Sequence, residues 1–188
     1  MLEAFNNVKR ERYLPKIYAK DAYLNSALPI GFGQTVSQPT TIAFMLSLLE
    51  ISPEDILTSE KKHFKILEVG SGSGYVLALL DQILDNAEIY GAERIKTLYL
   101  LSKEKFQKKK NIHICYTPKG VGLDAFKPFD RILVSASAKA IPENLLADLD
   151  TKGVLVCPVD DSVLKIKKNK KKIKKEKYNG FAFVPLLG

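Results

Sequence analysis

The residues best suited to chemistry lie between Ile66 and Tyr75, in the stretch ILEVGSGSGY. A short apolar run ends there in glycines at every second position, Gly70, Gly72 and Gly74, and an amphipathic segment follows. Glycine permits the tight turn that joins a strand to a helix, and its missing side chain lets a ligand approach the backbone. The G-x-G-x-G spacing predicts a site for an adenosine-containing ligand, with a dinucleotide and S-adenosylmethionine as the alternatives.

Two glutamates accompany these glycines. Glu93 follows the apolar run 87–91, about twenty positions further on, where an acid at the tip of a second strand binds ribose hydroxyls. The alternative for Glu93 is a solvated residue that stabilises the N-terminus of the next helix. Glu68 interrupts the apolar run before the glycines. A buried acid needs a partner, which for Glu68 is either the backbone or a ligand.

Composition limits the other classes of site. The chain of 188 residues is most simply one domain, and no apolar run approaches the ~20 residues that cross a bilayer. The N-terminus lacks the apolar stretch of a secretory signal. Cys115 and Cys157 lie in apolar segments, which predicts buried thiols and a cytoplasmic location. The two histidines, His63 and His113, are far apart in the sequence, so no metal site is expected.

Most of the net charge of +8 lies in residues 160–188, where nine lysines face three acids. Such a segment could bind a polyanion such as RNA by releasing counterions. However, few aromatic residues accompany the lysines, so a platform for stacking bases is not evident. We therefore favour a solvated hairpin whose lysines discourage pairing between sheet edges.

Apolar periodicity predicts the elements that must position these residues. Strands are expected at 65–69, 87–91, 111–115, 131–135, 153–159, 163–167 and 173–184, and helices at 40–51, 74–84, 94–109 and 142–149. This alternation predicts an α/β, Rossmann-like doubly wound fold with a mostly parallel seven-stranded sheet and helices on both faces. The link between the last two strands is too short for a parallel connection, so an antiparallel C-terminal strand is expected.

The flanking segments are less regular. Residues 1–26 suggest a short helix followed by a loop, and residues 27–39, rich in Gly, Pro, Ser, Thr and Gln, are expected to be irregular. We divide the single expected domain into an N-terminal segment facing substrate and cofactor (1–62), a cofactor-binding core (63–159) and a lysine-rich hairpin (160–188).

Several motifs together closely resemble the protein-L-isoaspartate O-methyltransferase family. They are the glycine loop, PIGFGQTVSQP (29–39), FDRILVSASAKAIPENLL (129–146) and FVPLL (183–187), and the resemblance extends over residues 2–187. Many methyltransferases share the glycine loop, whereas few carry a segment like 29–39 ahead of the first strand.

The resemblance implies a specific reaction. The family transfers a methyl group from S-adenosylmethionine to the α-carboxylate of an L-isoaspartyl residue in a damaged protein, leaving S-adenosylhomocysteine. The ester cyclises to a succinimide, which reopens partly to aspartate. By position, Ser37 matches the family's active-site serine, and the alternative for Ser37 is a cap of the following helix. The cofactor-binding residues implied are Thr35, Glu68, Gly70, Ser71, Gly72, Gly74 and Glu93.

The chain also departs from the family. Thr117-Pro118-Lys119 stands where members usually carry Gly-Asp-Gly, whose Asp contacts the adenine, and only the later Gly122 is kept. We therefore expect weaker cofactor binding. The leading helix is expected to be short, and the chain stops soon after residues 183–187. Ser135 and Ser137, at the end of the fourth strand, either line a substrate groove or serve close packing, and Asp130 is expected to be structural.

Three other functions remain as alternatives. One is a methyltransferase for RNA or a small molecule, another is a binding protein of the same fold with weakened catalysis, and the third is a dinucleotide-dependent oxidoreductase. The favoured interpretation is a cytoplasmic monomer that acts on damaged proteins and binds neither membranes nor nucleic acid.

Overall fold

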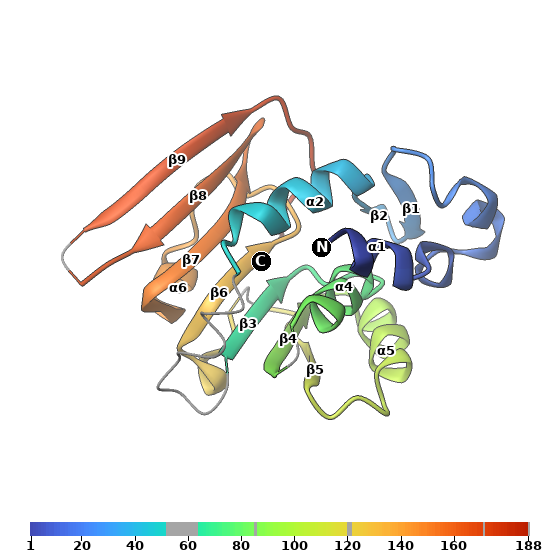
Figure 1. The fold of residues 1–188 in the computed structure, drawn as a ribbon, viewed down its shortest axis with the longest axis horizontal. Coiled ribbons are helices and arrows are strands. Elements are labelled where there is room, and N and C mark those ends of the chain that lie inside the picture. The colour runs from blue at the N-terminus through green and yellow to red at the C-terminus, as the bar shows by residue number, and fades with distance from the viewer. Residues whose placement is uncertain (52–63, 85, 120–121, 171, 188) are drawn as a thin grey trace.

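The central element of the fold is a seven-stranded sheet in the order β5-β4-β3-β6-β7-β8-β9 (Figure 1). The computed structural model describes residues 1–51, 64–84, 86–119, 122–170 and 172–187. Residues 52–63, which include His63 and connect the expected helix 40–51 to the expected strand 65–69, lie outside the described residues. Strand β3 (Phe64–Val69) lies inside the sheet and pairs in parallel with β4 (Ala87–Glu93) and β6 (Phe129–Val134).

The outer strands extend this sheet on both sides. Strand β5 (Ile112–Tyr116) is parallel to β4, and β7 (Leu149–Val159) is parallel to β6. Strand β8 (Ser162–Lys168) is antiparallel to β7, and β9 (Ile173–Asn179) is antiparallel to β8. The predicted mostly parallel, seven-stranded sheet with an antiparallel C-terminal strand is confirmed.

Successive residues of the central strands pack on opposite faces of the sheet, which explains why apolar residues predominate on both faces of these strands. Ile66 packs with residues of α1 (Leu2–Asn7), α2 (Pro39–Leu48), α4 (Tyr75–Ile83) and α5 (Lys96–Lys105). Leu67 packs on the other face, with Leu145 of α6 (Glu143–Asp148). Helices therefore cover both faces, as predicted.

The segment before α2 is more ordered than expected. After two 3-10 helices, η1 (Arg10–Tyr13) and η2 (Lys16–Asp21), strands β1 (Leu28–Gly31) and β2 (Gln34–Val36) form an antiparallel hairpin. The prediction of irregular structure for 27–39 was wrong here, because Gly31, Phe32 and Gly33 all take positive φ angles and close a tight turn.

The chain leaves the sheet earlier than expected at its C-terminal end. Strand β9 ends at Asn179 rather than residue 184, since Gly180 has a φ of 92° and turns the chain. The following residues cross the end of β6. Ser137 N–H donates to the Val184 carbonyl at 2.8 Å, and Leu186 N–H donates to the Ser137 carbonyl at 2.7 Å.

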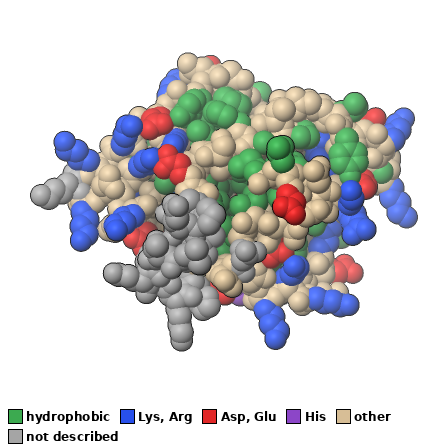
Figure 2. Space-filling view, viewed as in Figure 1, with side chains coloured by type: hydrophobic (Ala, Val, Ile, Leu, Met, Phe, Trp, Pro, Cys, Tyr) green, Lys and Arg blue, Asp and Glu red, His purple; other side chains and the backbone are tan. Residues whose placement is uncertain are grey.

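A 3-10 helix, η3 (Asp124–Phe126), precedes β6, and Asp130 accepts a hydrogen bond from Lys65 N–H at the start of the neighbouring strand β3. No described helix is both long and apolar enough to cross a membrane. Figure 2 shows hydrophobic side chains near the middle of one face and Lys and Arg side chains scattered around its rim.

Candidate active site

The glycine loop directly follows β3 and leads into α4. Gly70, Gly72 and Gly74 have φ angles of 80°, 52° and 84°, a region that other residues rarely adopt. A side chain at Gly74 would also collide with its neighbours, because its Cβ would lie 2.6 Å from the Phe106 ring and 2.8 Å from Ser102 Oγ. The loop therefore needs glycine for both its backbone and its packing.

The described residues enclose two small adjoining cavities at this loop, and a wider groove that shares Thr35 and Ser135 with both cavities. The cavities have volumes of about 40 and 50 Å³, and the groove about 570 Å³. Glu68 lines the first cavity and Glu93 the second, while Ser37 borders the first cavity and the groove. Thr35 and Ser135 border all three spaces. The structure thus brings the other predicted residues together around one site, whereas Gly74 lines none of the three spaces.

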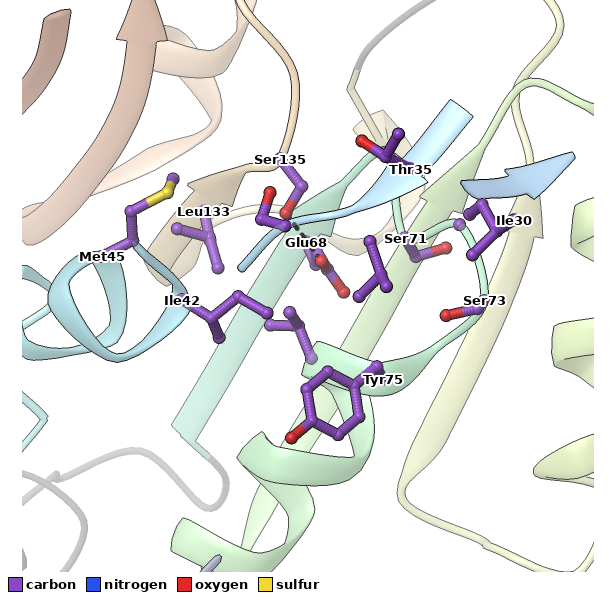
Figure 3. Close-up of a pocket in the computed structure, with 15 residues that line it drawn as sticks. Ile30, Thr35, Ile42, Met45, Glu68, Ser71, Ser73, Tyr75, Leu133 and Ser135 are labelled. Atoms are coloured by element: carbon purple, nitrogen blue, oxygen red, sulfur yellow. Dashed lines mark hydrogen bonds between the residues drawn. The ribbon is translucent and has the colours of Figure 1, made fainter. Parts of the chain in front are cut away.

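Glu68 is the most unusual group in the first cavity. Its side chain is only 2% exposed, and Ser135 Oγ donates to its Oε1 at 2.7 Å. Oε2 has no hydrogen-bond partner among the described residues. Burial raises the pKa of Glu68 to about 8, partly opposed by the Ser135 hydrogen bond. In Figure 3 the Glu68 and Ser135 side chains meet in the pocket between α2 and the glycine loop.

A second polar atom in the first cavity also lacks a partner in the described structure. Ser71 belongs to the glycine loop, is buried, and has an unpaired Oγ. Buried polar atoms are normally hydrogen-bonded, so Ser71 Oγ and Glu68 Oε2 mark a place where a polar ligand would complete the bonding. These two atoms and the positive-φ glycines fit the amino-acid portion of an adenosine-type cofactor.

Glu93 is held differently, at the end of β4. Its Oε2 accepts from Gly72 N–H at 2.8 Å and its Oε1 accepts from Ile95 N–H at 2.7 Å. The carboxylate therefore joins the glycine loop to the residue that precedes α5. Each oxygen has a further lone pair, which leaves capacity for the hydroxyls of a ribose.

The rest of the second cavity combines polar and apolar groups. Ile95, Leu98 and Ala136 supply apolar surface suited to a flat base, and Thr117 borders the same space. Thr117 N–H donates to the Glu93 carbonyl at 2.9 Å, while Pro118 and Lys119 do not line the cavity. Residues 117–119 therefore offer no carboxylate to this space. The weaker cofactor binding expected from this difference stays a prediction.

Ser37 lies directly after β2 and is partly buried. The N-cap of α2 is Gln38, and no side-chain hydrogen bond caps this helix. The alternative of a capping role for Ser37 is therefore wrong. Its backbone carbonyl accepts a hydrogen bond from Arg10 Nη2 at 3.1 Å.

Two residues at the site carried little or no signal in the sequence. Ser135 was left open between the groove and packing, and the structure places it beside all three spaces. Arg10 was not identified at all, because its partners are backbone carbonyls that any residue can supply. In the described part of the chain, no group of three or more His, Cys, Asp or Glu residues could hold a metal ion.

Comparison with known proteins extends over the whole chain. The model of the family described as protein-L-isoaspartate(D-aspartate) O-methyltransferase matches residues 1–188. A protein-L-isoaspartate O-methyltransferase of Flavobacterium johnsoniae is 39% identical over 194 residues, covering 100% of this chain and 85% of the relative. One from Photobacterium profundum is 38% identical, covering 100% of this chain and 87% of the relative.

Solved structures give the same picture. A Plasmodium falciparum protein described as a protein-L-isoaspartate O-methyltransferase, crystallised with S-adenosyl-L-homocysteine, superposes with a TM-score of 0.80 at 28% identity. The match covers 98% of this chain and 88% of that one. A second protein-L-isoaspartate O-methyltransferase superposes with a TM-score of 0.81 at 20% identity, covering 99% of this chain and 60% of that one, and supports the fold.

Proposed function

The chain belongs to the protein-L-isoaspartate(D-aspartate) O-methyltransferase family, and from that membership we propose how its residues perform the reaction. The reaction transfers a methyl group from S-adenosyl-L-methionine to the α-carboxylate of an L-isoaspartyl residue in a damaged protein. S-adenosyl-L-homocysteine is the other product. The observation that best supports the residue roles is the meeting of Ser37, Glu68 and the glycine loop around one cavity.

The cofactor would be held by residues of both cavities. S-adenosyl-L-methionine supplies an electrophilic methyl group bonded to a positively charged sulfur. Glu68 Oε2 and Ser71 Oγ, both buried and unpaired in the described structure, would bind its amino-acid portion beside Thr35. Glu93 would accept hydrogen bonds from the ribose hydroxyls, and Gly70 and Gly72 would let the cofactor approach the backbone. Gly74 would support the loop from behind, through its packing against Phe106 and Ser102.

The substrate carboxylate needs no general base. A carboxyl group with a pKa near 4 is already ionised at neutral pH, so the nucleophile is present before it binds. What the protein must supply is orientation, for which effective-molarity arguments allow roughly 7–11 kcal/mol at best. Ser37 lies at the boundary between the groove and the first cavity. Its hydroxyl would donate to one carboxylate oxygen and point the other toward the methyl group.

Methyl transfer to a synthetic L-isoaspartyl peptide tests this proposal. Transfer from labelled S-adenosyl-L-methionine should be specific for that peptide over its aspartyl counterpart. The Ser37→Ala variant should lose at least ~10-fold in kcat/KM, because misoriented reactants react more slowly. Ser47→Ala, at an exposed position on α2, is the matched control and should retain activity. Equal transfer to both peptides, or full activity of Ser37→Ala, would contradict the proposal.

The proposal also includes the domain organisation, the cellular location and the oligomeric state. The chain would act as one domain of residues 1–188, with segments 1–62, 63–159 and 160–188, and as a cytoplasmic monomer whose partners are damaged proteins. Light scattering at the assay concentration measures the molar mass and so tests whether the protein is a monomer. Calorimetric titration of S-adenosyl-L-homocysteine into wild type and Pro118→Asp checks the weaker cofactor binding, and equal affinities would refute it.

A further inference from the structure

Among the charged side chains that are almost completely buried in the described structure, Arg10 is the largest. Only 1% of the residue is exposed. Its Nη1 donates to the carbonyls of Ala22 at 2.6 Å and Leu24 at 3.3 Å. Its Nη2 donates to the carbonyls of Ser26 and Ser37, each at 3.1 Å. One guanidinium therefore holds four backbone carbonyls.

This cation has no carboxylate partner among the described residues, as its neighbour Glu11 instead accepts from the Tyr23 hydroxyl at 2.5 Å. The Arg10 guanidinium carbon lies 6.0 Å from the centre of the Tyr75 ring. Burial lowers the pKa of Arg10, but a guanidinium stays charged in proteins. Burying a charge among neutral partners costs free energy, so Arg10 maintains this geometry at the expense of folding stability.

The segments that Arg10 joins surround the candidate active site. Residues 22–26 precede the β1–β2 hairpin, and Ser37 follows it. Tyr75 is the first residue of α4 and lines the first cavity together with Ser37. Arg10 thus contacts both the Ser37 backbone and the ring of Tyr75, which directly follows the glycine loop.

The shape of the arginine side chain matters for this arrangement. A planar guanidinium directs its N–H groups along fixed directions, whereas a lysine ammonium is a single point with three donors on a flexible stem. Lysine would retain the charge but could not reproduce bonds from two separate nitrogens. Arginine and lysine are therefore distinguishable at this position.

We propose that Arg10 is a positioning residue for methyl transfer, which fixes the Ser37 carbonyl against residues 22–26 and so places the Ser37 hydroxyl relative to the glycine loop. This inference rests on the proposed role of Ser37. Arg10 itself lines none of the three spaces at the site, so it acts through the backbone of Ser37.

The first test compares Arg10→Lys with Arg12→Lys, a matched control at an exposed position in the same 3-10 helix. Arg10→Lys should lower kcat for the isoaspartyl peptide by ~10-fold or more, since small misplacements cost up to 10²-fold. The KM for peptide and the affinity for S-adenosyl-L-homocysteine, measured by calorimetry, should change less than ~3-fold. Arg12→Lys should behave as wild type.

The second test is a double-mutant cycle with Ser37→Ala. If Arg10 acts by placing the Ser37 hydroxyl, Arg10→Lys should cost less than ~2-fold when that hydroxyl is already absent. The proposal would be overturned if the two substitutions lowered kcat additively. It would also be overturned if the loss of kcat were fully explained by the fraction of unfolded protein that circular dichroism detects. Wild-type kcat in Arg10→Lys would do so as well.

A second variant guards against misfolding. Arg10→Gln leaves no buried charge and keeps a planar group with two donors, so the same cycle can be completed if Arg10→Lys does not fold. The proposed function and this inference fail separately. Full activity of Ser37→Ala would remove the assigned role of Ser37, whereas impaired Ser37→Ala with unimpaired Arg10 variants would overturn only the role of Arg10.

Discussion

Glu68 and Glu93 show how differently two buried acids can be used within one site. Glu93 receives two backbone N–H groups, one on each oxygen. Glu68 receives only the Ser135 hydroxyl, and its other oxygen has no partner in the described structure. Desolvation consequently dominates at Glu68 and raises its pKa to about 8. Glu68, like Ser71, thus has a buried polar atom at the site with no hydrogen-bond partner in the described structure.

The pKa of Glu68 predicts a pH dependence of stability. The pKa is about 8 in the folded protein against an ordinary value of 4.5. The folded state therefore binds more protons between these values, and this contribution to stability is complete below pH 4.5 and lost as the pH rises to about 8. Urea denaturation of wild type and Glu68→Gln at several pH values measures it.

Glu68→Gln removes this titration. The free energy of unfolding of the variant, minus that of wild type, should rise with pH across the window by at most about 1.4 kcal/mol per pH unit. Other titrating groups cancel in this difference. A constant difference from pH 5 to pH 8 would contradict the raised pKa.

At the scale of elements, the glycine loop combines a local and a tertiary requirement. The positive φ angles of Gly70, Gly72 and Gly74 are local and follow from the tight turn between β3 and α4. The close approach of Phe106 and Ser102 to Gly74 is tertiary, because it depends on how α5 packs on the loop. Only the first requirement is visible in the G-x-G-x-G spacing.

Two alanine substitutions separate these requirements. Gly180 has a φ of 92° and no neighbour within 4 Å of an added Cβ, so Gly180→Ala should cost only the backbone strain, about 1–2 kcal/mol. Gly74→Ala has similar strain and also collides with Phe106, which should add about 1–3 kcal/mol. Chemical denaturation measures the free energy of unfolding of both variants. Equal losses would show that α5 moves to accommodate the added methyl group.

At the scale of the whole molecule, the lysine-rich turn between β8 and β9 is separated from the site, although residues 180–187 line the groove and the second cavity. The cavities lie beyond the carboxyl ends of β3, β4 and β6, whereas β8 runs away from that edge and its turn to β9 lies at the opposite end of the sheet (Figure 1). Several hairpin lysines also have structural contacts. Lys165 and Lys167 pair with Glu50 beyond α2, and Lys168 donates to the carbonyls of Leu146 and Leu149.

Charge reversal at the turn should therefore leave catalysis unchanged. Strand β8 has seven residues and spans about 23 Å, which exceeds the Debye length of about 10 Å at 0.1 M salt. The double variant Lys170→Glu, Lys172→Glu should keep kcat/KM for the isoaspartyl peptide, and its salt dependence, within about 2-fold of wild type. A large loss, or labelled methyl transfer to RNA that this variant abolishes, would favour the polyanion alternative.

Local patterns determined the sheet and the cofactor loop. Apolar runs, glycine spacing and short links act over a few residues, so strands β3 to β8, the glycine loop and the antiparallel hairpin were predicted from the chain alone. The family resemblance of the motif 29–39 assigned Ser37 and Thr35 to the same site. Element ends were less accurate: α5 spans 96–105 instead of 94–109, because helix ends depend on their surroundings.

Only the tertiary structure decided how the site is completed. Ser135 and Glu68 are 67 positions apart and meet because their strands, β6 and β3, are neighbours in the sheet. Arg10 reaches Ser37 across 27 positions and binds its backbone carbonyl. A carbonyl is the same in every residue, so such a contact leaves no pattern in the sequence. The folded chain alone determines which carbonyls, cavities and unpaired oxygens lie within reach.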